Sequence, residues 1–143
     1  MLAYLLPVLT LAAALHHGPV PPDVARAVAV GCELEAERYP VDPRACAALV
    51  LVYAWHESRW QAHPDPVSSD AMADISCGLL QLPCRWLRID DYHWHTTAWE
   101  VRAWLALLRR GTLAGLSGGG RAGERLARVR EGEAQAALLA SDP

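Results

Sequence analysis

The fold is decided by one nearly unbroken apolar stretch, residues 45–55, which reads Ala-Cys-Ala-Ala-Leu-Val-Leu-Val-Tyr-Ala-Trp. Asp42 and Pro43 precede it and predict a helix start, because Asp caps free amide groups and Pro fits the first helical turn. A helix that is apolar on every side is surrounded by other elements. Its polar continuation, residues 56–59 (His-Glu-Ser-Arg), must therefore emerge from the core, and we expect a cleft at that end.

An earlier helix is predicted to begin at Pro21-Pro22-Asp23, with Asp23 as its cap. Apolar residues then recur at helical spacing up to Ala36. Tyr39 and Pro40 end this helix, since a residue before proline avoids the helical conformation.

Two later helices are predicted. Thr97 and Glu100 have the spacing of a capping box, in which Thr97 caps the helix and Glu100 reaches back to its first amide. This helix ends at Gly111. A last helix spans residues 124–139, although Gly132 weakens it. There is no alternating strand pattern of any length, so the sequence predicts an all-α fold, a small helical bundle.

The composition indicates one globular domain. The chain has 143 residues, of which 52% are hydrophobic and 20% charged, and its net charge is −3. That length can bury a core of its own. The balance of charge gives no electrostatic reason to expect a nucleic-acid partner. We expect a monomer that needs no cofactor and no metal.

The N-terminal residues 1–15 form an apolar run that is too short to span a bilayer comfortably but fits the apolar region of a signal peptide. No Arg precedes the run, and no clean cleavage site follows it. Two interpretations stay open for residues 1–18. They are either a signal peptide or an apolar helix that packs onto the domain formed by residues 19–143.

Four cysteines allow three pairings: Cys32, Cys46, Cys77 and Cys84. In an exported protein, a Cys77–Cys84 disulfide would close the loop between those residues, and Cys32–Cys46 would join the first two predicted helices. In a reducing compartment the four residues would be small apolar side chains.

Two short motifs carry a resemblance to a known family. Glu57-Ser58 stands at the end of the apolar helix, and Gly78-Leu79-Leu80-Gln81 follows after a loop. Together they resemble the lytic transglycosylase branch of the lysozyme superfamily, of the soluble-lytic-transglycosylase and phage-lysin type. The resemblance implies a small lysozyme-like helical domain outside the cytoplasm or in a phage. Its partner would be the glycan strands of peptidoglycan, cleaved at the β-1,4 bond between N-acetylmuramic acid and N-acetylglucosamine.

The resemblance also implies roles for individual residues. Glu57 would be the general acid and base, Ser58 would support it and the substrate, and Gln81 would line the floor of the cleft. Gly78 would let the backbone approach closely, where a side chain would intrude. In the family a third motif supplies a Tyr, and here Leu116 takes its place, so that Tyr92 or Tyr53 would have to supply the hydroxyl.

Glu57 also suits this chemistry on its own terms. Glycosidic cleavage delivers a proton to the leaving oxygen, and a carboxyl group beside apolar walls keeps that proton because desolvation disfavours its ionised form. Glu57 lies between Trp55 and Trp60 in the sequence, at the end of a helix whose dipole also disfavours a negative charge.

Further residues are candidates for contacts with the substrate. Aromatic faces stack on sugar rings, and Trp60, Trp86 and Tyr92 are the expected members of the cleft. A lysozyme-type hydrolase would also need a second carboxylate, for which Asp70 and Asp74 are the candidates. A transglycosylase needs none.

Parts of the sequence are also compatible with two other classes of function. Cys77, Cys84, His93 and His95 could form a zinc site, although their spacing differs from the usual ligand pairs. The replacement of the family's Tyr by Leu116 would suit a domain that binds peptidoglycan, or builds a virion, without cleaving a bond.

Overall fold

The computed structural model describes residues 2–15, 17–38, 42–62, 76–90 and 92–111, together with residues 127, 130–132 and 134. Three candidate site residues, Asp70, Asp74 and Leu116, lie outside the described residues. So does most of the helix predicted over 124–139, although residues 130–132 are helical. The described chain is mostly helical with one two-stranded sheet, which confirms the predicted all-α class.

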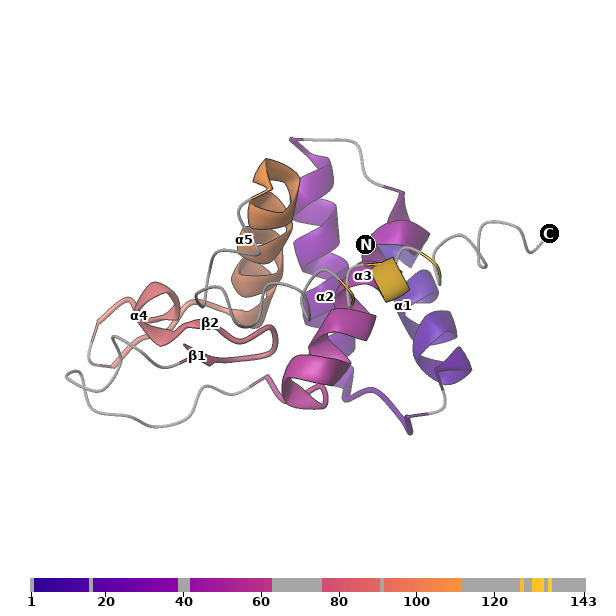
Figure 1. The fold of residues 1–143 in the computed structure, drawn as a ribbon, viewed down its shortest axis with the longest axis horizontal. Coiled ribbons are helices and arrows are strands. Elements are labelled where there is room, and N and C mark those ends of the chain that lie inside the picture. The colour runs from indigo at the N-terminus through magenta and orange to yellow at the C-terminus, as the bar shows by residue number, and fades with distance from the viewer. Residues whose placement is uncertain are drawn as a thin grey trace.

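The apolar helix is central, as predicted. It is α3 (Pro43–Ser58), and its residues from Val50 to Ala54 are all buried. Helices α1 (Leu2–Ala14) and α2 (Pro22–Ala36) pack against α3 and against each other, and α5 (Thr97–Arg110) packs against α2 (Figure 1). The middle of α3 therefore lies in the core, and its polar C-terminal end extends out of the core.

The caps of α2 and α3 differ. At α3 the Asp42 carboxylate accepts a hydrogen bond from the Ala45 amide at 3.0 Å, and Pro43 is the first helical residue, as predicted. At α2 the cap position is Pro21, which has no side chain to donate or accept a hydrogen bond, and the prediction that Asp23 caps this helix is wrong. Asp23 lies inside the first turn, where its negative charge still stabilises the helix by interacting with the positive end of the helix dipole.

Helix α5 begins one residue earlier than predicted, because Thr96 and not Thr97 is its cap. Its cap is Thr96, whose hydroxyl accepts a hydrogen bond from the Trp99 amide at 3.2 Å. Thr97 is the first helical residue, and Glu100 does not form the predicted capping box, because its carboxyl group is buried against another segment. The predicted end at Gly111 is confirmed, with a left-handed φ of 73°.

The second motif lies in a hairpin that the sequence did not reveal. Strands β1 (Ser76–Cys77) and β2 (Leu82–Pro83) pair antiparallel, residues 78–81 form the turn, and α4 (Cys84–Leu87) follows directly. The expectation of a short helix or turn over residues 78–87, broken at Pro83, is confirmed by the turn over residues 78–81 and the helix α4 after Pro83, whereas the two short strands were not expected. Strands of two residues are too short to show an alternating pattern.

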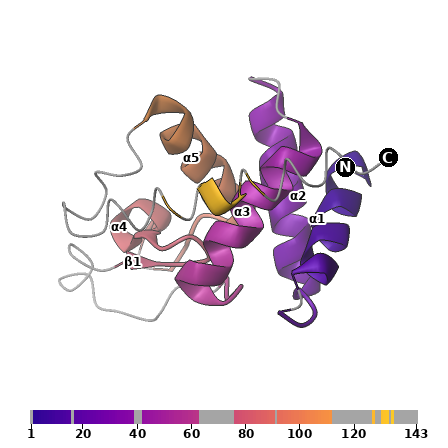
Figure 2. The same ribbon diagram turned by 45° about the vertical axis from the view of Figure 1, so that its right-hand side comes forward.

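The hairpin and α1 lie on opposite sides of the molecule, with α3 between them (Figures 1 and 2). Val8 and Leu11 of α1 are fully buried against the other helices, so in the full chain the N-terminal segment is a helix packed onto the domain. Its removal as a signal peptide stays a prediction. In the described part of the chain, no helix combines the length and apolar character needed to cross a membrane.

The cysteines pair as expected for an exported chain. Cys32 on α2 is bonded to Cys46 on α3, with Cα atoms 6.0 Å apart, and Cys77 is bonded to Cys84 across the hairpin, with Cα atoms 5.3 Å apart. Disulfide sulfurs cannot serve as thiolate ligands, which removes the zinc site considered from the sequence. Among the described residues, no three His, Cys, Asp or Glu side chains gather as metal ligands would.

Candidate functional site

The two motifs meet through a hydrogen bond. Ser58, on the last turn of α3, donates from Oγ to the carbonyl oxygen of Leu79 at 2.7 Å, and the same Oγ lies 3.1 Å from the carbonyl oxygen of Ala54. This contact spans 21 residues of sequence and is partly buried. It brings the helix end that carries Glu57 against the Gly78–Gln81 turn.

Glu57 itself is partly buried on the last turn of α3. Its neighbour His56 approaches Glu131 of the C-terminal helical segment, with 2.9 Å between Nε2 and Oε2. A hollow on the surface is lined by residues of α1 and by residues 18–20, and neither motif contributes to it. The cleft expected at Glu57 therefore stays a prediction.

Gly78 is required by its surroundings. Its φ is +83°, a left-handed value that disfavours any side chain. A Cβ atom there would lie 2.7 Å from both carboxylate oxygens of Glu100, which is too close for any real contact. The sequence predicted a close approach at this glycine, and the group that the structure places against it is a carboxyl group of the protein.

Glu100 is a buried residue beside the two motifs that was not expected from the sequence to contact them. Its Oε1 accepts a hydrogen bond from the Leu79 amide at 3.0 Å, and its Oε2 accepts one from the Leu80 amide at 2.9 Å. Its side chain is only 2% exposed. Burial raises the pKa of Glu100 to about 7, against the opposing effect of the two amide hydrogen bonds. A signal was present, because Glu100 is four residues before Trp104, on the buried face of α5.

Gln81 closes the turn. Its side-chain Nε2 donates to the carbonyl oxygen of Gly78 at 2.9 Å, and its φ of 54° is unusual for a residue with a side chain. The side chain is partly exposed. Its donor group is therefore used within the turn, while its role on the floor of a cleft stays a prediction.

Trp60 is a core residue, which corrects its assignment to the substrate site. It is 2% exposed, and its indole N–H donates to the carbonyl oxygen of Leu51 at 2.9 Å. Its ring packs edge-on against Trp55, with ring centroids 5.0 Å apart. The left-handed φ values of Arg59 and Trp60 turn the chain back after α3, which directs this side chain inward.

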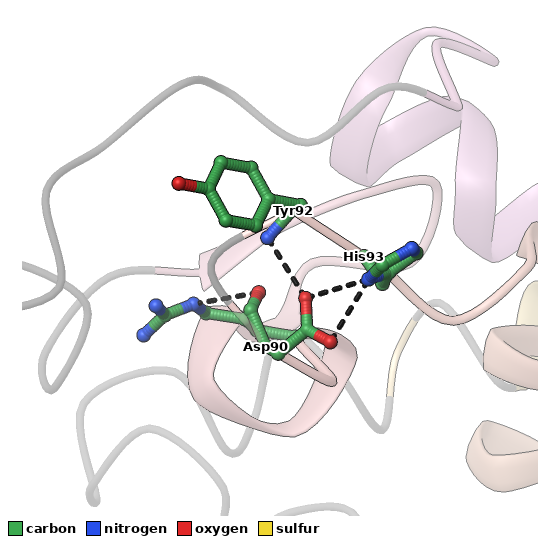
Figure 3. A network of polar contacts seen from close by, with 4 residues as sticks. Asp90, Tyr92 and His93 are labelled. Carbon is green, nitrogen blue, oxygen red and sulfur yellow. Dashed lines mark hydrogen bonds and ion pairs between the residues drawn. The ribbon is translucent and has the colours of Figure 1, made fainter.

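Trp86 and Tyr92 are exposed, at 37% and 89% of their surfaces. The Asp90 carboxylate accepts hydrogen bonds from the Tyr92 amide at 2.8 Å and from Nδ1 of His93 at 2.7 Å (Figure 3). Both contacts stabilise the ionised carboxylate and lower the pKa of Asp90, and the hydrogen bond from the Tyr92 amide has the larger effect. No hydrogen bond or ring contact between described residues joins either aromatic ring to Ser58 or the turn.

Tyr53, the other tyrosine considered as a source of the missing hydroxyl, is buried. It is 1% exposed, and its ring packs against Trp104 with centroids 4.8 Å apart. Tyr53 therefore contributes its ring to the core between α3 and α5.

Comparison with known proteins adds no relative. No protein-family model, no curated protein and no solved structure matches this chain. Its function is therefore inferred from its own residues and their geometry.

Proposed function

We propose that this chain is a lytic transglycosylase that cleaves peptidoglycan between N-acetylmuramic acid and N-acetylglucosamine. The observation that carries the proposal is the hydrogen bond from Ser58 to Leu79, which joins the Glu57-Ser58 motif to the Gly78-Leu79-Leu80-Gln81 motif. These motifs resemble those of the family, and a catalytic arrangement needs them to be adjacent in space. They could have stood apart in the fold.

Glu57 performs both proton transfers in this mechanism. Its protonated carboxyl group gives a proton to the glycosidic oxygen, and the bond from that oxygen to C1 of the muramic acid breaks. The resulting carboxylate then takes the proton of the C6 hydroxyl as the C6 oxygen bonds to C1. The product is a 1,6-anhydromuramyl end, and Glu57 is protonated again. The reaction therefore consumes no water and needs no second carboxylate.

Other parts of the molecule fit this substrate. Trp86 and Tyr92 offer exposed rings on which sugars of a long glycan strand can stack. The two disulfides favour a compartment outside the reducing cytoplasm, where peptidoglycan lies. The protein acts as a monomer without a cofactor.

Two alternatives lead to different products. A lysozyme-type hydrolase would use water, with Asp70 or Asp74 as the second carboxylate. A non-catalytic wall-binding or virion domain is favoured by the absence of a tyrosine at Leu116, since Tyr53 is buried in the core. The products of peptidoglycan digestion distinguish these two alternatives from the proposal, because a hydrolase leaves reducing ends and a non-catalytic domain leaves no products.

The test is mass spectrometry of purified peptidoglycan after incubation with the wild type, Glu57→Gln and Glu37→Gln. Glu37 is an exposed residue directly after α2, and its variant serves as control. Anhydromuropeptides from the wild type and Glu37→Gln, and none from Glu57→Gln, are expected. Reducing-end products would replace the proposal by hydrolysis. Products from Glu57→Gln, or none from the wild type, would overturn it.

A further inference from the structure

We infer that Glu100 is a positioning residue of this site, which holds the Gly78–Gln81 turn in place against the end of α3 that carries Glu57. The inference rests on the proposed function. It extends that function to a side chain on α5, which neither motif contains.

The carboxyl group of Glu100 accepts hydrogen bonds from two consecutive backbone amides. One oxygen accepts from Leu79 and the other from Leu80, at 3.0 and 2.9 Å. A planar group that binds two neighbouring amides fixes the orientation of the peptide between them as well as its distance. A Cβ atom at Gly78 would lie 2.7 Å from both oxygens, so only a glycine allows the turn to lie this close to Glu100.

The restraint is passed on through Leu79. Its N–H is held by Glu100, while its carbonyl oxygen accepts the hydrogen bond of Ser58. Ser58 is the neighbour of Glu57 in the sequence, on the same helical turn. The Leu79 carbonyl group shares its peptide unit with the Leu80 N–H, which Glu100 also binds. The path from Glu100 to Ser58 therefore consists of two hydrogen bonds and one peptide unit, and Ser58 is covalently linked to the proposed acid, Glu57.

Removal of one acceptor should loosen this path. Glu100→Gln keeps the size of the side chain, but its amide offers one accepting oxygen and one donating nitrogen, so one of the two backbone amides loses its partner. A displacement of about 1 Å between reacting groups can reduce a rate by roughly 100-fold. We expect a kcat that is about 10- to 100-fold lower, with a KM changed by less than about threefold.

Glu35 provides the matched control. It is the other buried carboxyl group of the described chain, it is 3% exposed, and it binds Arg109 on α5 and no part of the turn. A purely structural loss should appear in Glu35→Gln as it does in Glu100→Gln. A loss of position should appear in Glu100→Gln alone.

The experiment measures kcat and KM of the wild type, Glu57→Gln, Glu100→Gln and Glu35→Gln on soluble, uncrosslinked glycan strands, at a temperature where all four are folded by circular dichroism. NMR amide signals of Leu79 and Leu80 are recorded in parallel. The inference is supported if kcat falls in Glu100→Gln but not in Glu35→Gln, and the two signals move only in Glu100→Gln. If Glu100→Gln does not fold, Glu100→Asp and Glu35→Asp are compared in the same way.

Three results would contradict the inference, and they show whether the proposed function fails with it. Equal kcat values in the Glu100 and Glu35 variants, with an inactive Glu57→Gln, would overturn the inference and leave the proposed function standing. Unmoved Leu79 and Leu80 signals in Glu100→Gln would also overturn it. An inactive wild type would end both the proposed function and the inference.

Discussion

The described part of the chain buries two carboxyl groups, and it holds them in different ways. Glu35 on α2 binds the guanidinium of Arg109 at 3.1 Å, which ties α2 to α5 within the helical part. Glu100 on α5 binds two backbone amides and ties the helical part to the hairpin. A cation compensates a buried charge, whereas two amide dipoles do so less completely, and the pKa of Glu100 is raised to about 7.

The difference shows what each buried group can do. An ion pair between two helices holds elements that already pack along their lengths. A carboxyl group on two amides holds a four-residue turn against α5. The first arrangement serves the core, and the second sets the position of a motif.

The largest effect is expected from Gly78→Ala. The new methyl group meets a left-handed backbone and both oxygens of Glu100, so we expect a loss of about 4 kcal/mol in the free energy of unfolding. Gly111 has a similar φ of +73° with nothing within 4 Å, and Gly111→Ala should cost only about 1 kcal/mol. Urea denaturation measures both, and equal losses would show that Glu100 does not crowd the turn.

Arg109→Ala should be next. It leaves Glu35 buried without its cation, a situation that costs about 3 kcal/mol once the partial exposure of the Arg109 side chain is considered. Arg110→Ala, at the exposed neighbouring position, is the control and should change stability by less than about 0.5 kcal/mol. Similar thermal melting of the two variants would contradict the ion-pair interpretation.

The burial of Glu100 should also make the stability of the protein depend on pH. Glu100 has an ordinary pKa of 4.5 when unfolded and a pKa of about 7 when folded. Between these values the folded state keeps a proton that the unfolded state has released, so its stabilisation is complete below pH 4.5 and is lost as the pH rises through 7. The loss is about 3 kcal/mol.

Denaturant unfolding at pH 4.5 and at pH 8 tests this. The wild type should lose about 3 kcal/mol more than Glu100→Gln over that range, because the variant has no proton to release. A parallel pH dependence in the two proteins would contradict a raised pKa for Glu100.

The smallest effect distinguishes the two disulfides. Cys32–Cys46 closes a longer segment than Cys77–Cys84, with sequence separations of 14 and 7. Doubling a loop adds about 0.6 kcal/mol of closure entropy, so Cys32→Ala/Cys46→Ala should be less stable than Cys77→Ala/Cys84→Ala by about that amount. The second variant should nevertheless lose more glycan-cleaving activity, since its disulfide closes the hairpin. A larger activity loss in the first variant would contradict this.

Much of the helical framework could be predicted because its signals are local. Asp42 and Pro43 start α3, Gly111 ends α5, and the apolar sequence of α3 requires burial on every side. Each of these signals acts through neighbours within one or two turns. The error at Asp23 is of the same local kind, because two adjacent prolines compete with it for the start of α2.

The candidate site was less predictable. Glu57 and Ser58 were placed correctly at the end of α3, and the Gly78–Gln81 motif does contact Ser58. Trp60 and Glu100 were misassigned, the first to the substrate site and the second to a helix cap. In both cases the deciding partner is distant in the sequence, Leu51 for Trp60 and the turn amides for Glu100.

By itself, the sequence determined where α2, α3 and α5 lie, that α3 is central, and which two motifs are candidates for chemistry. Periodicity and capping depend on neighbouring residues, and these are written in order along the chain. Only the tertiary structure decided which acidic side chain is buried and what it holds. Glu100 can satisfy its own helix cap or the turn amides 20 residues away, and packing of α5 beside the hairpin selects the turn.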